Sequence, residues 1–301
     1  MVECRHSTTV GPVINSGLKG MSEPGTSESF QRYIAECWRL RFFTTNYALG
    51  RVRASRADMW LGSLWLVLEP AITVTTYYVV FELILGRGAG IENFIGFLAV
   101  GQMLFANGRK SIQRTATSLT RNEQLVESFT FPHLVFPLAD LLDAAVSLCY
   151  TLVVVLALLM ATGESPALAW LLILPIALSQ LLIGLGIGLL LGRIMSRATD
   201  LVVVMENVFR ALLFLSGVFW SVDKIATGAN RELLLKLLSV NPIYCAIQLG
   251  RWSLLGTRPE PLRWILGSMF LWIVVSMVLG MWRFYVGEQH HSGSLRVKRD
   301  R

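Results

Sequence analysis

The sequence contains few charged residues, and this shortage argues against a soluble globular enzyme. Only 16% of the 301 residues are charged and 53% are hydrophobic, whereas soluble domains average about 25% charged and roughly 45–50% apolar residues. The apolar residues gather in uncharged runs such as 144–161 and 167–192. Because about 20 such residues in a helix cross a bilayer, the composition predicts an all-α polytopic membrane protein.

Cysteine is scarce, and the common catalytic motifs are absent from the sequence. The four cysteines stand far apart, at Cys4, Cys37, Cys149 and Cys245. This spacing indicates neither a disulfide framework nor a zinc site, so we expect small apolar residues. The sequence also lacks HExxH, GxSxG, an acidic metal cluster and the phosphate-binding loop GxxxxGKS/T. We therefore expect no metal and no cofactor in this chain, and no ATP site of the loop type.

Basic residues outnumber acidic ones, with 27 Lys and Arg against 20 Asp and Glu. In a membrane protein this excess marks the cytoplasmic side and is no sign of nucleic-acid binding. With the N-terminus inside, 19 Lys and Arg lie on the cytoplasmic side and 7 outside. We therefore expect both termini in the cytoplasm. The six predicted spans cover about 60–86, 91–108, 134–161, 167–192, 201–220 and 262–285.

The regions before and after the spans are predicted as follows. Residues 1–29 are polar and lack the apolar run of a signal peptide, so we expect a disordered cytoplasmic tail, with Met21 as an alternative start. Residues 30–59 are expected to form a cytoplasmic interfacial helix, or a helix packed on a partner protein. Residues 60–285 form the predicted six-span domain, and 286–301 a basic cytoplasmic tail. The apolar face of the interfacial helix comprises Phe30, Tyr33, Ile34, Cys37 and Trp38.

The long segment 221–261 between the fifth and sixth spans has an ambiguous pattern. Its stretch 233–249 is apolar enough to suggest a seventh crossing, but that crossing would place the basic tail outside. We predict two short re-entrant helices that dip into the outer leaflet, because irregular backbone is tolerated there only when protein or water surrounds it. Two amphipathic helices lying on the outer surface are the alternative.

Two pairs of ionisable residues stand close together in the sequence within or beside the predicted spans. Glu206 and Arg210 are four residues apart on one helix, so we expect them to neutralise each other. Asp140 and Asp143 lie near the start of the third span, where a helix N-terminus stabilises carboxylates. A proton relay through these two residues is the alternative.

Glycines and aromatic residues form two further patterns in the spans. Gly184, Gly188 and Gly192 recur every four residues, which favours close approach of a neighbouring helix. Aromatic rings in the first and fifth spans are interpreted as the lining of a path for sugars, with lipid contact and core packing as the alternative. They are Trp65, Tyr77, Tyr78, Phe81, Phe219 and Trp220.

Three groups of residues together carry a resemblance to a known family. The first is LGSLW at 61–65 with Pro70; the second is Asn122, LV at 125–126, FP at 131–132 and FPL at 136–138; the third is FLSGVFW at 214–220, NPI at 241–243, RW at 251–252 and LLG at 254–256. In this order, the sequence resembles the membrane subunits of ABC-2 type exporters for cell-surface polysaccharides, including O-antigen and teichoic-acid permeases. Glu69 and the segment 197–200 depart from the family pattern.

The resemblance implies a transport subunit without enzymatic activity of its own. It implies a homodimer in the bacterial plasma (inner) membrane, joined to two copies of a separate ATPase that binds ATP and Mg. The implied cargo is a polysaccharide linked to polyprenyl pyrophosphate. It also implies an ATPase coupling segment with contacts at Asn122, Glu123, Gln124, Leu125 and Val126, and an outer gate containing Asn241, Pro242, Arg251 and Trp252.

Basic residues at the inner surface form a hypothetical site for the pyrophosphate, because guanidinium forks match phosphate oxygens. They are Arg51, Arg53, Arg56, Arg109 and Lys110. Simple anchoring to membrane lipids is the alternative for these residues. Two other functions are also considered for the whole chain. One is a proton-coupled transporter using Asp140 and Asp143; the other is a membrane-embedded glycosyltransferase or acyltransferase, for which no acid/base or metal constellation is found in the sequence.

Overall fold

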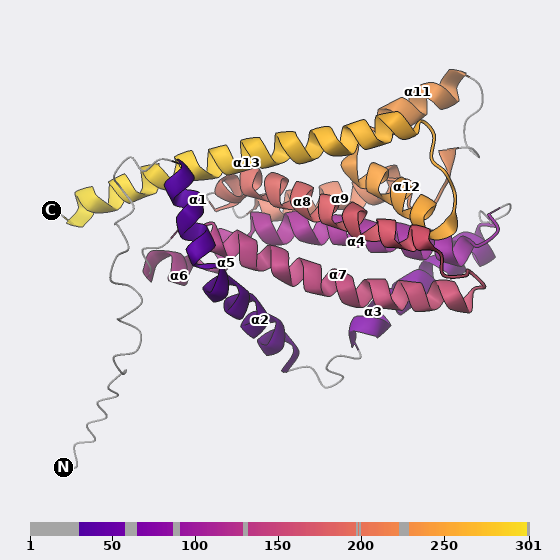
Figure 1. Cartoon of the computed structure of the whole chain (residues 1–301), viewed down its shortest axis with the longest axis horizontal. Coiled ribbons are helices and arrows are strands. Elements are labelled where there is room, and N and C mark those ends of the chain that lie inside the picture. The colour runs from indigo at the N-terminus through magenta and orange to yellow at the C-terminus, as the bar shows by residue number, and fades with distance from the viewer. Residues whose placement is uncertain are drawn as a thin grey trace, which may run out of the picture.

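The computed structural model describes residues 30–57, 65–86, 91–128, 132–196, 198, 200–222 and 229–299, and these form helices without strands (Figure 1). Helices α1 (Phe30–Arg39) and α6 (Glu123–Ser128) lie at the end of the bundle toward which the last helix, α13 (Leu262–Arg299), runs (Figure 1). The elements are α1 (Phe30–Arg39), α2 (Arg41–Ala57), α3 (Trp65–Tyr78), η2 (Val79–Ile84), α4 (Phe94–Ala116), α5 (Ser118–Arg121), α6 (Glu123–Ser128), α7 (Val135–Ala161), η3 (Leu168–Leu172), α8 (Ile173–Met195), α9 (Leu201–Leu215), α11 (Ala229–Leu238), α12 (Pro242–Leu255) and α13 (Leu262–Arg299).

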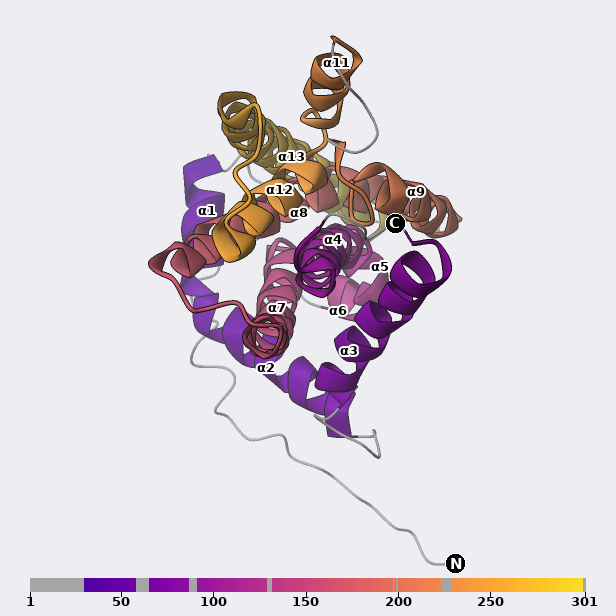
Figure 2. The same cartoon turned by 90° about the vertical axis from the view of Figure 1, so that its right-hand side faces the viewer.

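Helix α4 forms the centre of the bundle, with α7 and α8 packed against it (Figure 2). Its apolar residues point into the core, and Leu98, Val100 and Leu104 have no exposed surface. Helix α8 lies between α4 and α13. This layering buries Asn107 and Ser111 of α4 against α8, where Asn107 donates to the Gln180 side chain at 3.0 Å and Ser111 donates to the Leu181 carbonyl at 3.4 Å.

The glycines of α8 let two neighbouring helices approach closely, as their spacing predicts. A Cβ at Gly184 would collide with Ser111 of α4, and one at Gly188 would collide with Thr115. The opposite face of α8 is equally tight, because a Cβ at Gly186 would meet the backbone of Ser276 on α13. The prediction of close helix packing is confirmed at Gly184 and Gly188, whereas a Cβ at Gly192 would come no nearer than 3.6 Å to the Ala116 carbonyl oxygen.

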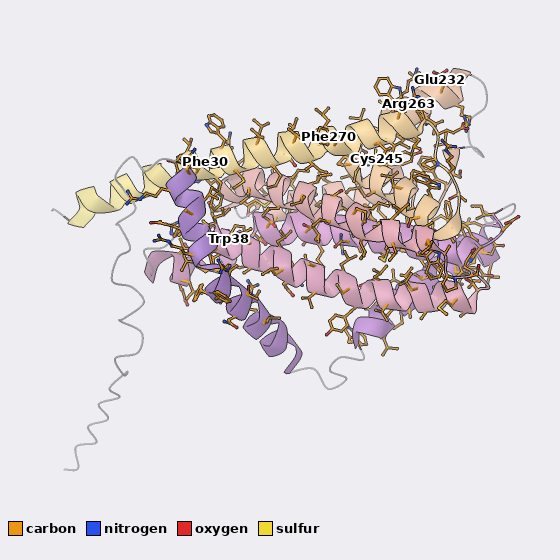
Figure 3. The ribbon with its side chains drawn as sticks, viewed as in Figure 1. Phe30, Trp38, Glu232, Cys245, Arg263 and Phe270 are labelled. Carbon is orange, nitrogen blue, oxygen red and sulfur yellow. The ribbon has the colours of Figure 1, made fainter. Side chains whose placement is uncertain are left out.

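Three helices of the described chain are long and apolar enough to cross a membrane: Val135–Ala161, Leu168–Met195 and Leu262–Gly287. The pair Asn230–Leu238 and Pro242–Leu255 has membrane-like composition but is bent by 105°. A bend of this size fits the re-entrant pair predicted for this region. Many large apolar side chains face outward, among them Phe270 on α13, which is 70% exposed (Figure 3). Outward apolar surface of this kind suits contact with lipid.

Two helices continue past the ends of the predicted spans. The second span was expected to end near Gly108, yet α4 continues to Ala116. The reason is that α7 provides partners for the basic residues of this extension, since the Lys110 ammonium donates to the Ser147 hydroxyl and Arg114 forms an ion pair with Asp143. Helix α13 likewise continues to Arg299, but its part that is long and apolar enough to cross a membrane, Leu262–Gly287, ends two residues from the predicted end at 285.

The interfacial segment consists of two helices, α1 and α2, where one was predicted. Tyr33 and Cys37 of α1 are buried, whereas Trp38 is 69% exposed. The rings of Phe30 and Tyr33 both contact the Tyr285 ring edge-on, with centroids 5.4 Å apart. The predicted apolar face is therefore divided, with part of it packed on α13 and part of it, including Trp38, open to the surroundings (Figure 3). The predicted tail 1–29 lies outside the described residues.

Candidate functional site

The predicted coupling segment comprises Asn122, which joins the short helices α5 and α6, and the first four residues of α6. We call α5, Asn122 and α6 together the coupling turn. Asn122 is only 7% exposed. Its amide donates to the Ser118 carbonyl at 2.7 Å, and its Oδ1 accepts a hydrogen bond from the Tyr47 hydroxyl of α2 at 2.6 Å. Asn122 therefore connects the coupling turn to α2 of the interfacial segment. The Asn122 carbonyl also accepts from two backbone amides at the start of α6, which fixes the direction of that helix.

The other four residues of the segment point in two directions. Glu123 and Gln124 are exposed on the outer side of the turn. Leu125 and Val126 are half-buried and pack against Phe136 of α7. The turn therefore has an apolar root in the bundle and a polar outer surface, which is the arrangement that a docking element for a soluble partner needs.

Three charged residues from three helices meet beside this turn, and we call them the Asp140 junction. The Asp140 carboxylate of α7 has no exposed surface. Its two oxygens pair with Arg51 of α2 at 2.8 Å and with Arg121 of α5 at 2.9 Å. Arg121 also donates to the Arg114 carbonyl of α4 at 2.8 Å. The junction therefore links α2, the coupling turn, α4 and α7 within one polar network.

Sequence reasoning missed this junction and assigned its members elsewhere. Asp140 and Asp143 were interpreted as helix-end carboxylates or a proton relay, whereas the structure places each of them in an ion pair with arginine. Arg51 was assigned to pyrophosphate, whereas Asp140 engages its guanidinium. Arg51 and Asp140 are 89 residues apart in the sequence. No local pattern joins them, and only the tertiary fold reveals the pairing.

The predicted basic cluster is not one patch among the described side chains. Arg109 is exposed on α4. Lys110 lines a cavity of about 100 Å³ between α3, α4 and α7, together with Glu69 and Gln102. Its ammonium donates to the Ser147 hydroxyl at 2.6 Å. The side chains of Arg53 and Arg56 lie outside the described residues. Among the described basic residues of the predicted cluster, only Lys110 lines this cavity.

Several aromatic residues of the predicted path gather at the far end of α3 from the coupling turn. The Phe219 ring stacks on Phe81 at 4.4 Å between centroids and meets Tyr77 edge-on at 4.8 Å. Tyr78 lies beside the Phe94 ring at 6.5 Å. The η2 segment that carries Phe81 is a π-helix, a form that is frequent at functional sites. We call Tyr77, Phe81 and Phe219 the aromatic cluster.

Two other predicted path residues have different surroundings. The Trp220 indole donates to the Phe214 carbonyl at 2.7 Å, which fixes the turn after α9. Trp65 begins α3 and is 44% exposed. The sequence grouped these residues by type alone, and the fold separates Trp65 from the others by the length of a helix.

Arg251 of α12 is a fully buried cation that holds the bent helix pair to the bundle. Its guanidinium donates to the carbonyls of Gly217 and Val218, each at 2.9 Å, and to the Phe97 carbonyl at 3.3 Å. It also lies 3.3 Å from the centroid of the Phe97 ring, a cation–π contact. The family resemblance implies that Arg251 belongs to an outer gate. The structure shows that Arg251 joins α12 to α4 and to the turn after α9.

Asn241 and Pro242 start α12 at the bend of the same helix pair. The Asn241 side chain caps the helix by accepting from the Ile243 amide at 3.0 Å, and its amide donates to the Ser216 hydroxyl at 3.0 Å. Pro242 occupies the first turn, where a missing amide proton is tolerated. Trp252 packs in an apolar cluster between α12 and α13. Asn241 and Pro242 thus determine the start of α12 at the bend, whereas Arg251 and Trp252 hold α12 to its neighbours.

The predicted pair of Glu206 and Arg210 is not formed among the described side chains. Both residues are exposed on α9. The Arg210 guanidinium turns to the Asn207 side chain, to which it donates at 3.3 Å. The expected neutralisation along one helix is therefore wrong, because an amide three residues away takes the arginine. The exposed side chains of Glu206, Asn207 and Arg210 therefore form a polar face on an otherwise apolar helix.

The chain has helices long enough to cross a bilayer, a buried ionic junction at one end of the bundle and a bent helix pair at the other. These features define a multi-pass α-helical membrane protein. In the part of the chain that the structure describes, no group of acidic, histidine or cysteine side chains is arranged to hold a metal. A family model for ABC-2 type transporters matches residues 48–255. The chain belongs to this family of transport proteins.

Known relatives share parts of this sequence. An O-antigen export system permease protein RfbA from Klebsiella pneumoniae is 28% identical over 130 residues, which cover 43% of this chain and 49% of that protein. A protein of the same name from Myxococcus xanthus is 24% identical over 206 residues, covering 68% of this chain and 78% of the relative. The chain thus spans about half the length of the Klebsiella relatives that it matches.

Proposed function

We propose that this chain is the transmembrane subunit of an exporter that moves a polyprenyl-pyrophosphate-linked cell-surface polysaccharide, driven by a separate ATPase. One observation carries the proposal beyond family membership. The coupling turn presents Glu123 and Gln124 outward and is tied through Asn122 and Arg121 to α2 and α7. Through these contacts, a movement of the coupling turn that is caused by a bound partner is transmitted to α2 and α7.

The absence of a phosphate-binding loop from the sequence supports a partner ATPase. In this proposal two copies of that ATPase bind ATP and Mg and dock on the coupling turns of two permease subunits. Closure of the ATPases shifts the turn, and the Asp140 junction carries the shift to α2 and α7. Coupling of this kind needs a rigid contact network between the two sites, and the buried ion pairs provide one.

The proposal includes six spans, with both termini cytoplasmic, in the inner membrane of a bacterium. Helices α3, α4 and α9 supply the three spans beyond the three that are long and apolar enough on their own. We place α3 and α9, which lie on the same side of α4 (Figure 2), against a second copy of the chain. Exposed Glu206 and Arg210 support this placement, because polar groups within a membrane usually face protein or water.

The polysaccharide cargo is proposed from the names of the relatives and from two features of this chain. The aromatic cluster offers flat rings with polar edges, and such rings suit sugars. Lys110 supplies a cation beside a small polar cavity toward the opposite end of α3, where a phosphate group of a lipid carrier is attracted. The bent pair α11 and α12 is proposed as the outer gate, which Arg251 holds closed.

Reversing the charge at Glu123 tests the ATPase contact. We expect Glu123→Arg to weaken association with the partner ATPase by about tenfold, because interface charges are arranged to be complementary. The measurement is co-purification with the ATPase followed by a binding titration. Glu92→Arg is the matched control, since Glu92 is also exposed but precedes α4 at the other end of the bundle. Equal binding by both variants and wild type, with transport intact, would contradict the contact.

A further inference from the structure

Helix α9 carries a group of polar side chains on a side that faces away from its own bundle. Glu206, Asn207 and Arg210 are exposed, whereas Met205 and Phe209 are buried and attach the helix to the core. Residues three and four apart in a helix lie on one side of it, so Asn207 and Glu206 share a side with Arg210. We call Glu206, Asn207 and Arg210 the α9 polar face.

Apolar residues border the α9 polar face along the same side of the helix. Val203 lies three residues before Glu206 and is 61% exposed, and Phe214 lies four residues after Arg210 and is 58% exposed. The Phe214 ring also lies 5.5 Å from the Phe219 ring of the aromatic cluster, between centroids. Polar side chains with apolar neighbours on a membrane helix favour contact with another helix, because polar groups there usually face protein or water.

The charges of the α9 polar face are only partly matched within the chain. Arg210 donates to the Asn207 side chain at 3.3 Å, but a guanidinium has five N–H donors in all. Within the described ranges of the chain, which include the whole of α9, no hydrogen bond or ion pair engages the Glu206 carboxylate. The face therefore presents an acceptor and further donors to whatever lies against it.

We propose that the α9 polar faces of two copies of this chain meet, and that Glu206 of each copy pairs with Arg210 of the other. The pairing rests on the proposed function, in which α9 is a span and the chain forms a homodimer. Two copies with the same orientation in the membrane are related by a two-fold axis along the membrane normal, so their α9 helices run in the same direction. Each Glu206 then lies about one helical turn from the Arg210 of the other copy, an offset that charged side chains bridge between parallel helices.

A second copy satisfies both charges of the α9 polar face, whereas lipid or cargo would satisfy one of them at most. Lipid tails offer the Glu206 carboxylate no donor. A phosphate group of the cargo would engage Arg210, but Glu206 lies one turn away and would repel it. With one acid and one base, the face is complementary to itself under a two-fold axis.

Exchange of the two charges tests the pairing. Glu206→Arg leaves only positive charge on both faces and Arg210→Glu leaves only negative charge, so we expect each to raise the dissociation constant of the dimer at least about tenfold. The double variant, Glu206→Arg with Arg210→Glu, again has one acid and one base, and we expect its dissociation constant to return to within about threefold of wild type. Energy transfer between donor-labelled and acceptor-labelled full-length chains in micelles measures the dimer, without ATPase or glycan.

A matched control reverses a charge with the same spacing elsewhere on the chain. Glu232 of α11 stands four residues before Lys236 and its side chain is 71% exposed, and we expect Glu232→Arg to dimerise as wild type does. Single variants of the α9 polar face that dimerise as tightly as wild type would overturn the pairing. So would weakened single variants that the double variant does not restore.

The same measurement separates the pairing from the proposed function. A wild-type chain that stays monomeric would contradict both the pairing and the proposed homodimer. A wild-type dimer that is indifferent to the charges at Glu206 and Arg210 would overturn the pairing and leave the proposed export function standing. Unchanged dimerisation of Arg210→Glu together with lost transport would place the α9 polar face on the cargo passage instead.

Cross-linking keeps the pairing testable where a charge reversal prevents folding. In a background with Cys4→Ala and Cys149→Ala, Val203→Cys places a thiol on the side of the α9 polar face, and Val208→Cys places one on another side. Both valines are exposed, at 61% and 50%. Under mild oxidation in membranes we expect Val203→Cys to form at least about tenfold more disulfide-linked dimer, because cysteines with Cα atoms more than about 7 Å apart cannot be bridged. Equal cross-linking at both positions would contradict contact between the polar faces.

Discussion

Asp140→Asn is the perturbation that tests the Asp140 junction. The substitution keeps the size of the side chain and removes its charge, so the charge-assisted hydrogen bond from Arg51 becomes weak or is lost and the ion pair with Arg121 disappears. A hydrogen bond to a charged group contributes about 1.5–3 kcal/mol. The partners Arg51 and Arg121 are 29% and 37% exposed, so water can take over part of their solvation. We therefore expect a loss of about 2 kcal/mol in the free energy of unfolding, below the roughly 3–5 kcal/mol of a fully buried pair.

Coupling should be affected more than stability. If the junction transmits motion from the coupling turn, the Asp140→Asn complex hydrolyses ATP near the wild-type rate while its ATP-driven transport falls by about tenfold. Unfolding in mixed micelles measures the stability, and proteoliposomes that contain both subunits measure hydrolysis and transport in one sample.

A neighbouring carboxylate provides the matched control. Asp143 lies on the same helix and pairs with Arg114 of α4, which is not part of the coupling turn. Asp143→Asn is expected to lower stability while keeping hydrolysis and transport proportional. A double-mutant cycle between Asp140→Asn and Arg51→Gln is expected to give a coupling energy above about 0.5 kcal/mol. Proportional losses of hydrolysis and transport in Asp140→Asn, together with a coupling energy of zero, would refute the junction.

Two further substitutions test the close packing of α8 on α4 and the contacts that Arg251 makes from α12. Gly188→Val is expected to destabilise the chain by about 1–3 kcal/mol, because its side chain would collide with Thr115. Gly267→Val on α13, where nothing lies within 4 Å of an added Cβ, is the control, and equal unfolding free energies would contradict the close approach of α8 to α4. Arg251→Lys is expected to cost about 2 kcal/mol, because one ammonium cannot reproduce the fork that binds three carbonyls. Arg258→Lys at an exposed site is its control, and a thermal unfolding profile unchanged in both variants would remove Arg251 from its proposed role.

Patterns within single helices could be predicted from the sequence. The spacing of Gly184 and Gly188 determines which face of α8 is smooth, whatever helix packs there, and the structure confirms the close packing. The bend at 241–242 follows from a capping side chain and a proline, both of which act locally. The long apolar runs likewise predicted three spans. These are Val135–Ala161, Leu168–Met195 and Leu262–Gly287, and every end lies within three residues of its prediction.

Contacts between distant segments could not be predicted. The Arg51 and Asp140 pairing joins residues 89 positions apart, and their identities alone fit several roles. Local rules were also insufficient where a tertiary partner competed with them. We predicted that the second span ends at Gly108, because charges oppose membrane burial. Helix α4 nevertheless continues to Ala116, since Ser147 and Asp143 of α7 provide polar partners for Lys110 and Arg114. Glu206 and Arg210 have favourable spacing for an ion pair, yet Asn207 takes the arginine.

The central claim is that this chain provides a passage through the membrane and depends on a separate ATPase for energy. Reconstitution in proteoliposomes with a lipid-linked glycan, with and without the partner ATPase, tests it most directly. We predict transport against a concentration gradient only when both subunits and ATP are present. Uphill movement of the glycan by the isolated chain, whether or not a proton gradient is applied, would contradict the account.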